Sequence, residues 1–371
     1  MPRIIEPDRR LFGVTLALCL IGAVMVFSAS AMTAREQYGN PYYFLLRQIL
    51  WAVIGVLGMF GLMRTDYHKL RQPRVIFTGL ALTLVLLIAV YFLDRSHATH
   101  RWIRFGPLSL QPSEVAKLMV IFYLAWFLEI RCAPRAPGVN HFRRTLLPIL
   151  GTVALITALI YKEPDLGTAC MIFFIAAVMI FVAGLSYRYI VAAALAAIPV
   201  IYVAIASTPY RLERVKTFFS PSADPQGHGF QLLQSLIAVG SGGFTGVGLM
   251  ESRQKLFFLP EAHTDFIFSV ICEELGFIGA IVILTLFAFY GWRGFVAAMK
   301  APDDFGRFLG IGITTMVVGQ ALINLSVVLG LLPTKGIPLP FISYGGSSLL
   351  GMLLATGVLL NISQQADADV T

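Results

Sequence analysis

Asp265 stands where a carboxylate could do chemistry. It ends the polar stretch 253–264, which includes His263, and an apolar segment that reaches about Tyr290 follows it directly. A carboxylate at the mouth of a membrane-length helix can act as an acid or a base, and it can also cap the helix by accepting hydrogen bonds from free backbone amides. A capping box is absent, because Phe268 stands where Glu or Gln would complete it. Both roles are open from the residues alone.

A second pair of charged residues lies at the start of another apolar segment. Glu114 and Lys117 follow Gln111, Pro112 and Ser113 and are three positions apart, so that on a helix they can form an ion pair. A charge within a membrane span costs about 2.5–3.5 kcal/mol on insertion scales, which predicts that the pair faces the bundle interior and serves a function. The alternative is a salt bridge that only adjusts the depth of the helix near the membrane interface.

Three further cations and one histidine complete the set of candidates. Three prolines in the segment 333–341 make the chain around Lys335 rigid, and Arg47 lies at the outer end of the second apolar run. Both side chains could instead anchor the protein at the membrane interface. Arg214 lies in the long polar connection. His263 has no second histidine at ligand spacing, which argues against a histidine-based metal site.

The composition indicates that these residues belong to an integral membrane protein. Hydrophobic residues make up 57% of the chain, charged residues only 13%, and the mean hydropathy is +0.77. The 371 residues have room for about ten spanning helices of about twenty residues each, and the continuously apolar runs disfavour a β-barrel. The sequence therefore predicts an all-α, polytopic bundle in a single domain, residues 1–371. We expect spans near 11–31, 44–63, 75–93, 114–130, 146–161, 167–184, 189–207, 265–290, 308–332 and 342–362.

The longest connection, residues 208–264, separates the seventh and eighth expected spans. With the N-terminus inside, fifteen basic residues fall in the inner segments and seven in the short outer ones. The positive-inside rule then places both termini in the cytoplasm and makes 208–264 an extracytoplasmic loop. The site should therefore open to the outer face of the membrane. The net charge of +8 is dispersed between spans, which is typical of topology signals and not of nucleic-acid binding, and the four single cysteines suggest neither disulfides nor a zinc site.

Two other features, one polar and one glycine-rich, have structural explanations. Glu273 and Glu274 lie about 12–14 Å along the helix from Asp265 and point away from it, so we expect them to bond to neighbouring segments. Five glycines between 240 and 248 are followed by no Gly-Lys-Ser/Thr and preceded by no strand, which favours close backbone packing or a turn over a phosphate-binding loop.

Charged residues also gather between the fifth and sixth expected spans. Lys162, Glu163 and Asp165 lie beside Pro164 and Gly167, which impose a tight turn. A functional cluster and an ordinary solvated turn are equally compatible with this pattern.

Several long segments resemble the signature motifs of the SEDS proteins, the FtsW/RodA family. They occur in the family's order, and the ten-span hydropathy pattern covers essentially the whole chain. SRQKLFFLPEAHTDF, PTKGIPLPFISYGGSSL and the early FSAS and NPYYFLLRQ are more similar to FtsW than to RodA. The five segments are HRWIRFGPLSLQPSEVAKL (100–118), EPDLGTA (163–169), QSLIAVGSGG (234–243), SRQKLFFLPEAHTDFIFSVICEELG (252–276) and LPTKGIPLPFISYGGSSLL (332–350).

The resemblance implies a peptidoglycan glycosyltransferase that polymerises lipid II at the outer face of the bacterial cytoplasmic (inner) membrane. A class B penicillin-binding protein would be its transpeptidase partner, together with other division proteins, in septal wall synthesis. The family's essential aspartate falls on Asp265, which would be the catalytic residue. A divalent cation, Mg or Mn, held partly by Asp265, could assist, and no organic cofactor is expected. The candidate substrate-binding residues are Glu114, Lys117, Arg47, Arg214, Lys335 and His263.

In the implied reaction, Asp265 takes the proton from the acceptor's 4-hydroxyl while cations stabilise the departing pyrophosphate. Aspartate is a weak base at its usual pKa of about 3.9, and partial burial should raise that value. A lipid flippase or transporter is the main rival, because Glu273, Glu274, Gln320 and Asn324 fall outside the outer group of polar residues. An elongation-specific polymerase of the RodA kind and a non-catalytic scaffold are further alternatives.

Overall fold

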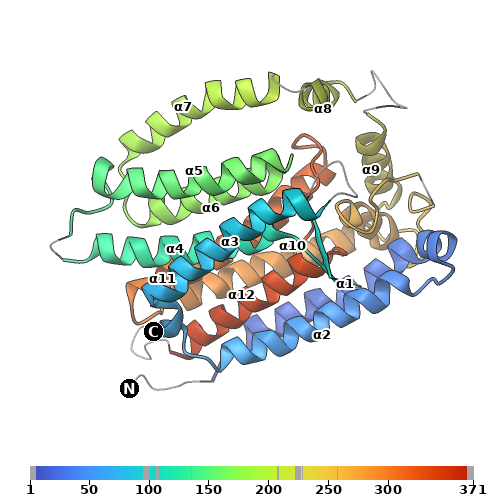
Figure 1. The fold of residues 1–371 in the computed structure, drawn as a ribbon. Coiled ribbons are helices and arrows are strands. Elements are labelled where there is room, and N and C mark those ends of the chain that lie inside the picture. Colours follow the sequence, from blue (N-terminus) through green and yellow to red (C-terminus); the bar gives the residue numbers. More distant parts are fainter. Residues whose placement is uncertain are drawn as a thin grey trace.

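The computed structural model describes residues 6–94, 101–105, 108–134, 136–206, 209–221, 227, 229–256 and 258–365. Within these ranges the chain forms a bundle of long helices that run along a common direction (Figure 1). The elements are α1 (Arg9–Tyr38), α2 (Tyr43–Met63), η1 (Tyr67–Arg71), α3 (Pro73–Leu93), β1 (Ile103–Phe105), β2 (Leu108–Leu110), α4 (Pro112–Cys132), η2 (Phe142–Leu146), α5 (Leu147–Lys162), α6 (Leu166–Val182), α7 (Tyr187–Ala206), α8 (Pro209–Phe219), α9 (Phe230–Ser241), α10 (Ile267–Met299), α11 (Asp304–Val328) and α12 (Gly346–Gln364).

The predicted all-α membrane architecture is confirmed, and each expected span has a helix, α1 to α7 and α10 to α12. In the described part of the chain, seven helical segments are long and apolar enough to cross a membrane. They are α1, α2, α3, η2 with α5, α10, α11 and α12. Of the others, α4 carries four charged residues and α6 is 17 residues long. Helices satisfy their backbone hydrogen bonds internally, which the hydrocarbon interior requires.

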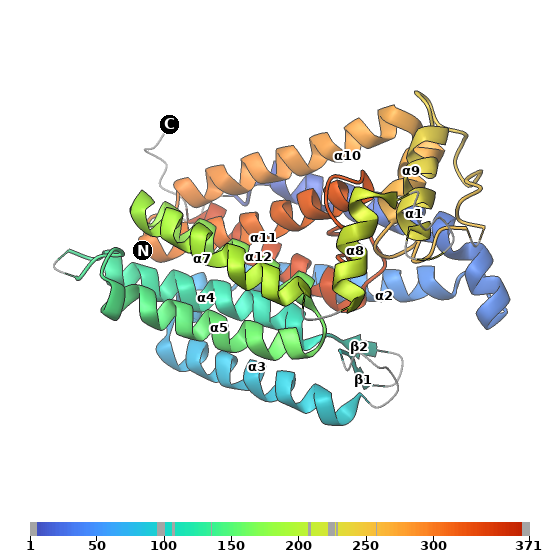
Figure 2. The same cartoon turned by 90° about the horizontal axis from the view of Figure 1, so that it is seen from above.

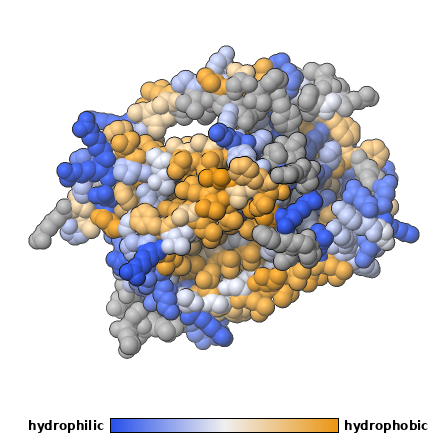
Figure 3. Space-filling view, viewed as in Figure 1, coloured by the Kyte–Doolittle hydropathy of each residue, from blue (hydrophilic) through white to orange (hydrophobic). Residues whose placement is uncertain are grey.

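On the face drawn in Figure 3, apolar side chains lie between two polar ends. Inside the bundle, α2 packs along α12, α10 along α11, and α11 against α4. Among the described residues, α7 makes extensive contacts only with α8, and Figure 1 shows it set apart from the other long helices. Its exposed side chains are almost all apolar, as expected for a helix that faces lipid.

The two termini lie at one end of the bundle. The Asp8 backbone N–H donates to Ser363 Oγ at 3.2 Å, and Arg293 Nε donates to Asp8 Oδ2 at 2.8 Å. These bonds join the start of α1 to the ends of α10 and α12. The long connection with α8 and α9, and the β1–β2 hairpin, lie at the opposite end (Figure 2).

The glycine-rich segment lies directly against a kink in α10. Gly276 has φ +64°, and a Cβ on Gly242 would lie 1.9 Å from the Cys272 carbonyl oxygen. The backbone N–H groups of Val247 and Gly248 donate to the carbonyls of Glu273 and Glu274 at 3.0 and 3.1 Å. The expected close backbone packing is confirmed, because the kink frees these carbonyls and only glycine lets a second backbone approach them.

Candidate active site

Asp265 precedes α10 without capping it. The N-cap of α10 is Phe266, and no side chain there bonds the first amides of the helix. Instead, Asn324 of α11 holds the backbone, because its Nδ2 donates to the carbonyl oxygens of Asp265 and Ile337, each at 2.7 Å. The capping alternative for Asp265 is therefore wrong, and its carboxylate is left for another role.

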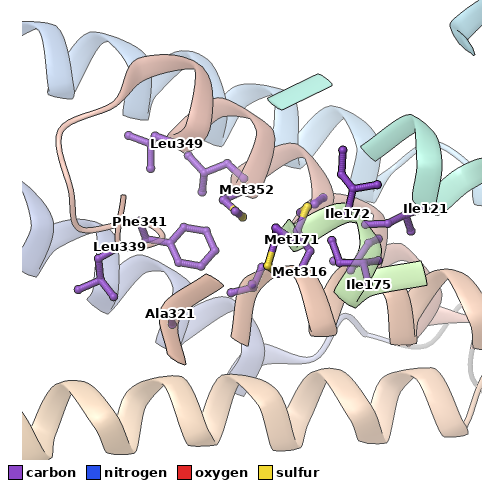
Figure 4. Close-up of a cluster of buried hydrophobic side chains, with 14 of the residues drawn as sticks. Ile121, Met171, Ile172, Ile175, Met316, Ala321, Leu339, Phe341, Leu349 and Met352 are labelled. Carbon is purple, nitrogen blue, oxygen red and sulfur yellow. The ribbon is translucent and has the colours of Figure 1, made fainter. Parts of the chain in front are cut away.

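Segment 333–345, between α11 and α12, forms one wall around this aspartate. Ser343 Oγ donates to the Thr264 carbonyl at 2.5 Å, and the Tyr344 amide donates to the His263 carbonyl at 3.0 Å. Leu339 and Phe341 of this segment belong to the cluster of buried side chains drawn in Figure 4, and they anchor the segment in the bundle interior. Gly336 lies directly against the aspartate, since a Cβ there would lie 2.6 Å from Asp265 Oδ2 and would displace it.

The Asp265 carboxylate lines a cavity of about 310 Å³ at the end of the bundle opposite the termini. Charged side chains and Gln320 reach the cavity from five separate parts of the chain: the hairpin region, α4, the start of α6, the loop before α10, and α11. They include Arg101, Glu114, Lys117, Asp165, Glu261 and Gln320. A cavity of this kind, with convergent charged groups, is a candidate active site.

The pKa of Asp265 lies near neutrality. Burial raises it to about 7, with further contributions from the negative charges of Glu261 and Asp165, while Arg101 and Arg214 partly offset the rise. Within the described residues, no side chain donates a hydrogen bond to this carboxylate. The expected effect of burial is thus present, and the group is suited to act as a base near neutral pH.

The predicted ion pair on α4 is present and deeply buried. Lys117 Nζ lies 2.9 Å from Glu114 Oε1, and the two side chains are 3% and 6% exposed. Lys117 also donates to Gln320 Oε1 at 2.7 Å, and Gln320 Nε2 donates to the Pro338 carbonyl at 2.9 Å. This chain of bonds connects α4 through α11 to segment 333–345, so the pair both lines the cavity and supports its wall.

Arg47 and His263 do not line the cavity. The guanidinium of Arg47 lies 4.3 Å from the centre of the Tyr43 ring, and the His263 ring lies 4.5 Å from that of Phe44. Both residues contact Tyr344, which does line the cavity. Burial lowers the pKa of His263, which favours its neutral form. The structure therefore places both residues behind the cavity wall.

Arg214 and Lys335 flank the cavity without being part of its lining. Arg214 Nη1 donates to the Thr334 carbonyl at 3.0 Å, which connects α8 to segment 333–345. The Lys335 side chain lies against α6, where a Cβ on Gly167 would come within 2.9 Å of Lys335 Cε. Both cations are thus close to the residues that surround Asp265.

Most of the cavity residues were not among the predicted site residues, and these include three charged ones and Gln320. Arg101, Asp165, Glu261 and Gln320 lie in separate loops and helices, so spacing alone does not bring them together. Their position in the sequence gave a signal, because Arg101, Asp165 and Glu261 fall in the segments that carry the family resemblance.

The fold and the cavity define a polytopic helical membrane protein with a half-buried acid and cations gathered at one end. A family model described as "Cell cycle protein" (FtsW, RodA, SpoVE) matches residues 9–368, and the chain belongs to this family. The stage V sporulation protein E of Bacillus subtilis is 44% identical over 97% of each chain. A probable peptidoglycan glycosyltransferase FtsW of Geobacter metallireducens is 44% identical over 94% of this chain and 92% of that protein.

Solved structures agree with this assignment. A chain from a structure described as "Structural coordination of polymerization and crosslinking by a peptidoglycan synthase complex" is 31% identical, with a TM-score of 0.78 over 98% of this chain and 99% of that one. The rod shape determining protein RodA of Thermus thermophilus is 27% identical, with a TM-score of 0.70 over 98% of both chains. The predicted family is confirmed, and so is the greater similarity to FtsW than to RodA.

Proposed function

We propose that this chain is a peptidoglycan glycosyltransferase that polymerises lipid II. The observation that carries the proposal is the carboxylate of Asp265, which has a pKa of about 7 and lines a cavity together with Arg101 and Lys117. A base that works near neutral pH and cations for a pyrophosphate are the two requirements of the reaction. The name of the FtsW relative supports the same activity.

In the proposed reaction, the ionised Asp265 takes the proton from the acceptor's 4-hydroxyl as that oxygen attacks the anomeric carbon of the donor. The bond from this carbon to the pyrophosphate oxygen breaks, and undecaprenyl pyrophosphate leaves with the electron pair. Positive charge from the cavity stabilises the departing group. Direct displacement inverts the anomeric centre, so that an α-linked donor becomes a β-linked glycan without a covalent intermediate.

The rival lipid flippase depended on polar residues away from the outer group, and these residues have structural partners. Gln320 and Asn324 hold segment 333–345 and the backbone of Asp265, as described above. Glu273 accepts hydrogen bonds from Ser252 Oγ and the Arg253 amide, and Glu274 binds Lys255. Their positions therefore need no transport path, which favours the polymerase.

We propose that both termini are cytoplasmic and that the cavity opens outside the cytoplasmic membrane. The excess of basic residues in the expected inner segments supports this orientation. The termini and the cavity lie at opposite ends of the bundle, as the proposed orientation requires.

A divalent cation is compatible with the cavity only with help from the substrate. In the described part of the chain, no three His, Cys, Asp or Glu side chains are grouped closely enough to hold an ion. Mg²⁺ commonly binds one or two carboxylates together with substrate phosphates, so Asp265 could supply the protein ligand. A bound Mg²⁺ or Mn²⁺ would neutralise charge on the pyrophosphate. Activity measured after chelation with EDTA and after adding each metal back tests this proposal.

We further propose that the polymerase works with a class B penicillin-binding protein in septal wall synthesis. The similar chain comes from a structure whose description joins polymerization to crosslinking, and the FtsW names of the relatives favour division over elongation. Depletion of the protein in its host should then give filaments, whereas rounded cells would indicate an elongation role.

The deciding experiment incubates the purified chain with labelled lipid II, alone and with its transpeptidase partner. Long glycan strands that require Asp265 are the expected product. Movement of lipid II between leaflets of vesicles without polymer would indicate a flippase. Neither activity, with binding of the partner intact, would indicate a scaffold.

A further inference from the structure

The guanidinium of Arg101 lines the cavity and meets no carboxylate at ion-pair distance in the described structure, while the backbone N–H of the same residue donates to Asp94 Oδ2 at 3.0 Å. Its Nε donates to the Glu163 carbonyl at 2.8 Å, and its Nη2 donates to the Pro164 carbonyl. The other lining cation, Lys117, is paired with Glu114. Two of the five N–H groups of Arg101 thus fix the guanidinium against the α5–α6 turn, and the remaining three can bind an anion.

The side chain of Glu163 lies in the same turn and has no hydrogen-bond partner among the described residues. It is 0% exposed, and neither carboxylate oxygen accepts a hydrogen bond from the described residues. An ionised carboxylate in this position would be strongly unfavourable, so the side chain holds a proton instead. Burial and the charge of Asp165 raise the pKa of Glu163 to about 8, and Arg101 offsets part of the rise.

We propose that Arg101 binds a phosphate group of the lipid-linked substrate and that Glu163 is a positioning residue. Because the Glu163 side chain is neutral, it does not pair with Arg101 and leaves the guanidinium available to the phosphate. The inference rests on the proposed function, because the anion is the pyrophosphate of the glycosyl donor or of the leaving lipid. A planar guanidinium held by two carbonyls suits a phosphate, which it can bind with two parallel hydrogen bonds. The turn that positions Arg101 also carries the acid that would compete for it when ionised.

The proposal predicts a specific dependence on pH. Below about pH 8 Glu163 is neutral, and above it the side chain ionises and competes with the substrate phosphate for Arg101. The KM for lipid II should therefore rise with pH. The other titratable or charged groups that act on Glu163 or lie near it are Asp165, Arg101 and Tyr91. Asp265 ionises near pH 7 and acts on kcat, so the two titrations are separated by measuring kcat and KM individually.

The test uses the full chain in nanodiscs with labelled lipid II at about pH 7 and about pH 9, below and above the pKa of Glu163. The wild type should show a KM several-fold higher at the alkaline pH. Glu163→Gln is neutral at both values and should keep a low KM throughout. Glu36→Gln removes an exposed carboxylate of α1 outside the cavity and should behave like the wild type. Arg101→Gln should raise KM about tenfold or more at both values, as expected for loss of hydrogen bonds to a charged group.

Two results would overturn the proposal: a KM in Glu163→Gln that rises with pH as in the wild type, or an unchanged KM in Arg101→Gln. If Glu163→Gln fails to fold, the wild-type KM still decides, because a KM independent of pH refutes the idea. Binding of undecaprenyl pyrophosphate, which has no sugar to transfer, should weaken at alkaline pH in the same way. Binding with this pH dependence but without glycan synthesis would refute the proposed function alone.

Discussion

The acids near the start of α10 have opposite environments: Glu273 and Glu274 are buried, and Asp265 is half-buried. Glu274 receives hydrogen bonds from Lys255 Nζ and Ser28 Oγ, each at 2.7 Å, and Glu273 receives bonds from Ser252 Oγ and the Arg253 amide at 2.5 and 2.9 Å. The carboxylate of Asp265 receives none from the described residues. A carboxylate whose partners are all present stabilises one arrangement, whereas one without donors keeps its reactivity.

The hydrogen bonds of Glu273 and Glu274 also support the position of Asp265. Lys255 and Ser252 belong to the loop that leads to Glu261 and Asp265, and their bonds fix this loop to α1 and α10. The fully bonded glutamates of α10 therefore hold in place the loop that carries Glu261 and Asp265. The difference teaches that burial alone does not identify a reactive acid in this protein; the absence of hydrogen-bond donors together with a place in the cavity lining does.

The largest effect is expected for Asp265→Asn. The amide keeps the shape of the side chain but cannot accept the proton, so kcat should fall by about 10²–10⁴-fold, the usual contribution of a general base. Membrane insertion and partner binding should be intact. Polymerisation of labelled lipid II by the purified variant is the measurement, and full activity would refute the assignment of the base.

Lys255→Met tests whether the fully bonded glutamates of α10 have a structural role. Removing one partner of a buried pair leaves Glu274 unpaired and should lower the free energy of unfolding by about 3–5 kcal/mol. Thermal unfolding in detergent measures the effect. Lys216→Met, which breaks the exposed pair with Glu213, is the matched control and should cost at most about 1 kcal/mol. Equal shifts for both variants would contradict the structural role of the buried pair.

Gly336→Ala asks whether the position of the Asp265 carboxylate matters. The new Cβ would lie 2.6 Å from Oδ2 and must displace the carboxylate. A displacement on the scale of 1 Å can reduce turnover by about 10²-fold. Gly240→Ala, where a Cβ would meet nothing within 4 Å, provides the control. Unchanged turnover together with a normal melting temperature would show that the site tolerates a moved carboxylate.

Glu114→Gln should have a smaller effect on glycan synthesis. Lys117 keeps its bond to Gln320 but loses its counter-charge, so we expect turnover to fall by about tenfold, the scale of a lost hydrogen bond to a charged group. Initial rates with lipid II measure this loss. Wild-type turnover would support the alternative of a salt bridge that only adjusts helix depth.

The smallest effect is expected on stability as a function of pH. The pKa of Asp265 is raised in the folded state from 3.8 to about 7, so the folded protein binds more protons than the unfolded chain between these values. Stability is therefore lost as pH rises through this window. Asp265→Asn should melt at a higher temperature than the wild type at about pH 8, by a margin that shrinks towards pH 4. An equal difference at both pH values would contradict the raised pKa.

The sequence determined the membrane class and the helices. A long apolar run must form a helix in a bilayer, because its backbone has no other hydrogen-bond partners there, and this requirement is local. The pairing of Glu114 with Lys117 was readable for the same reason, since three positions on one helix bring the side chains together. The glycines near 240–248 likewise indicated close backbone packing or a turn, but they did not indicate that α10 is the neighbour.

Only the tertiary structure decided which polar groups share the cavity. Arg101 and Asp165 reach Asp265 from distant loops, while Arg47 and His263 lie behind Tyr344. These placements depend on how separate helices pack, which no local pattern encodes. The charge state of Glu163 follows from the same packing, because its desolvation depends on neighbours brought from other parts of the chain.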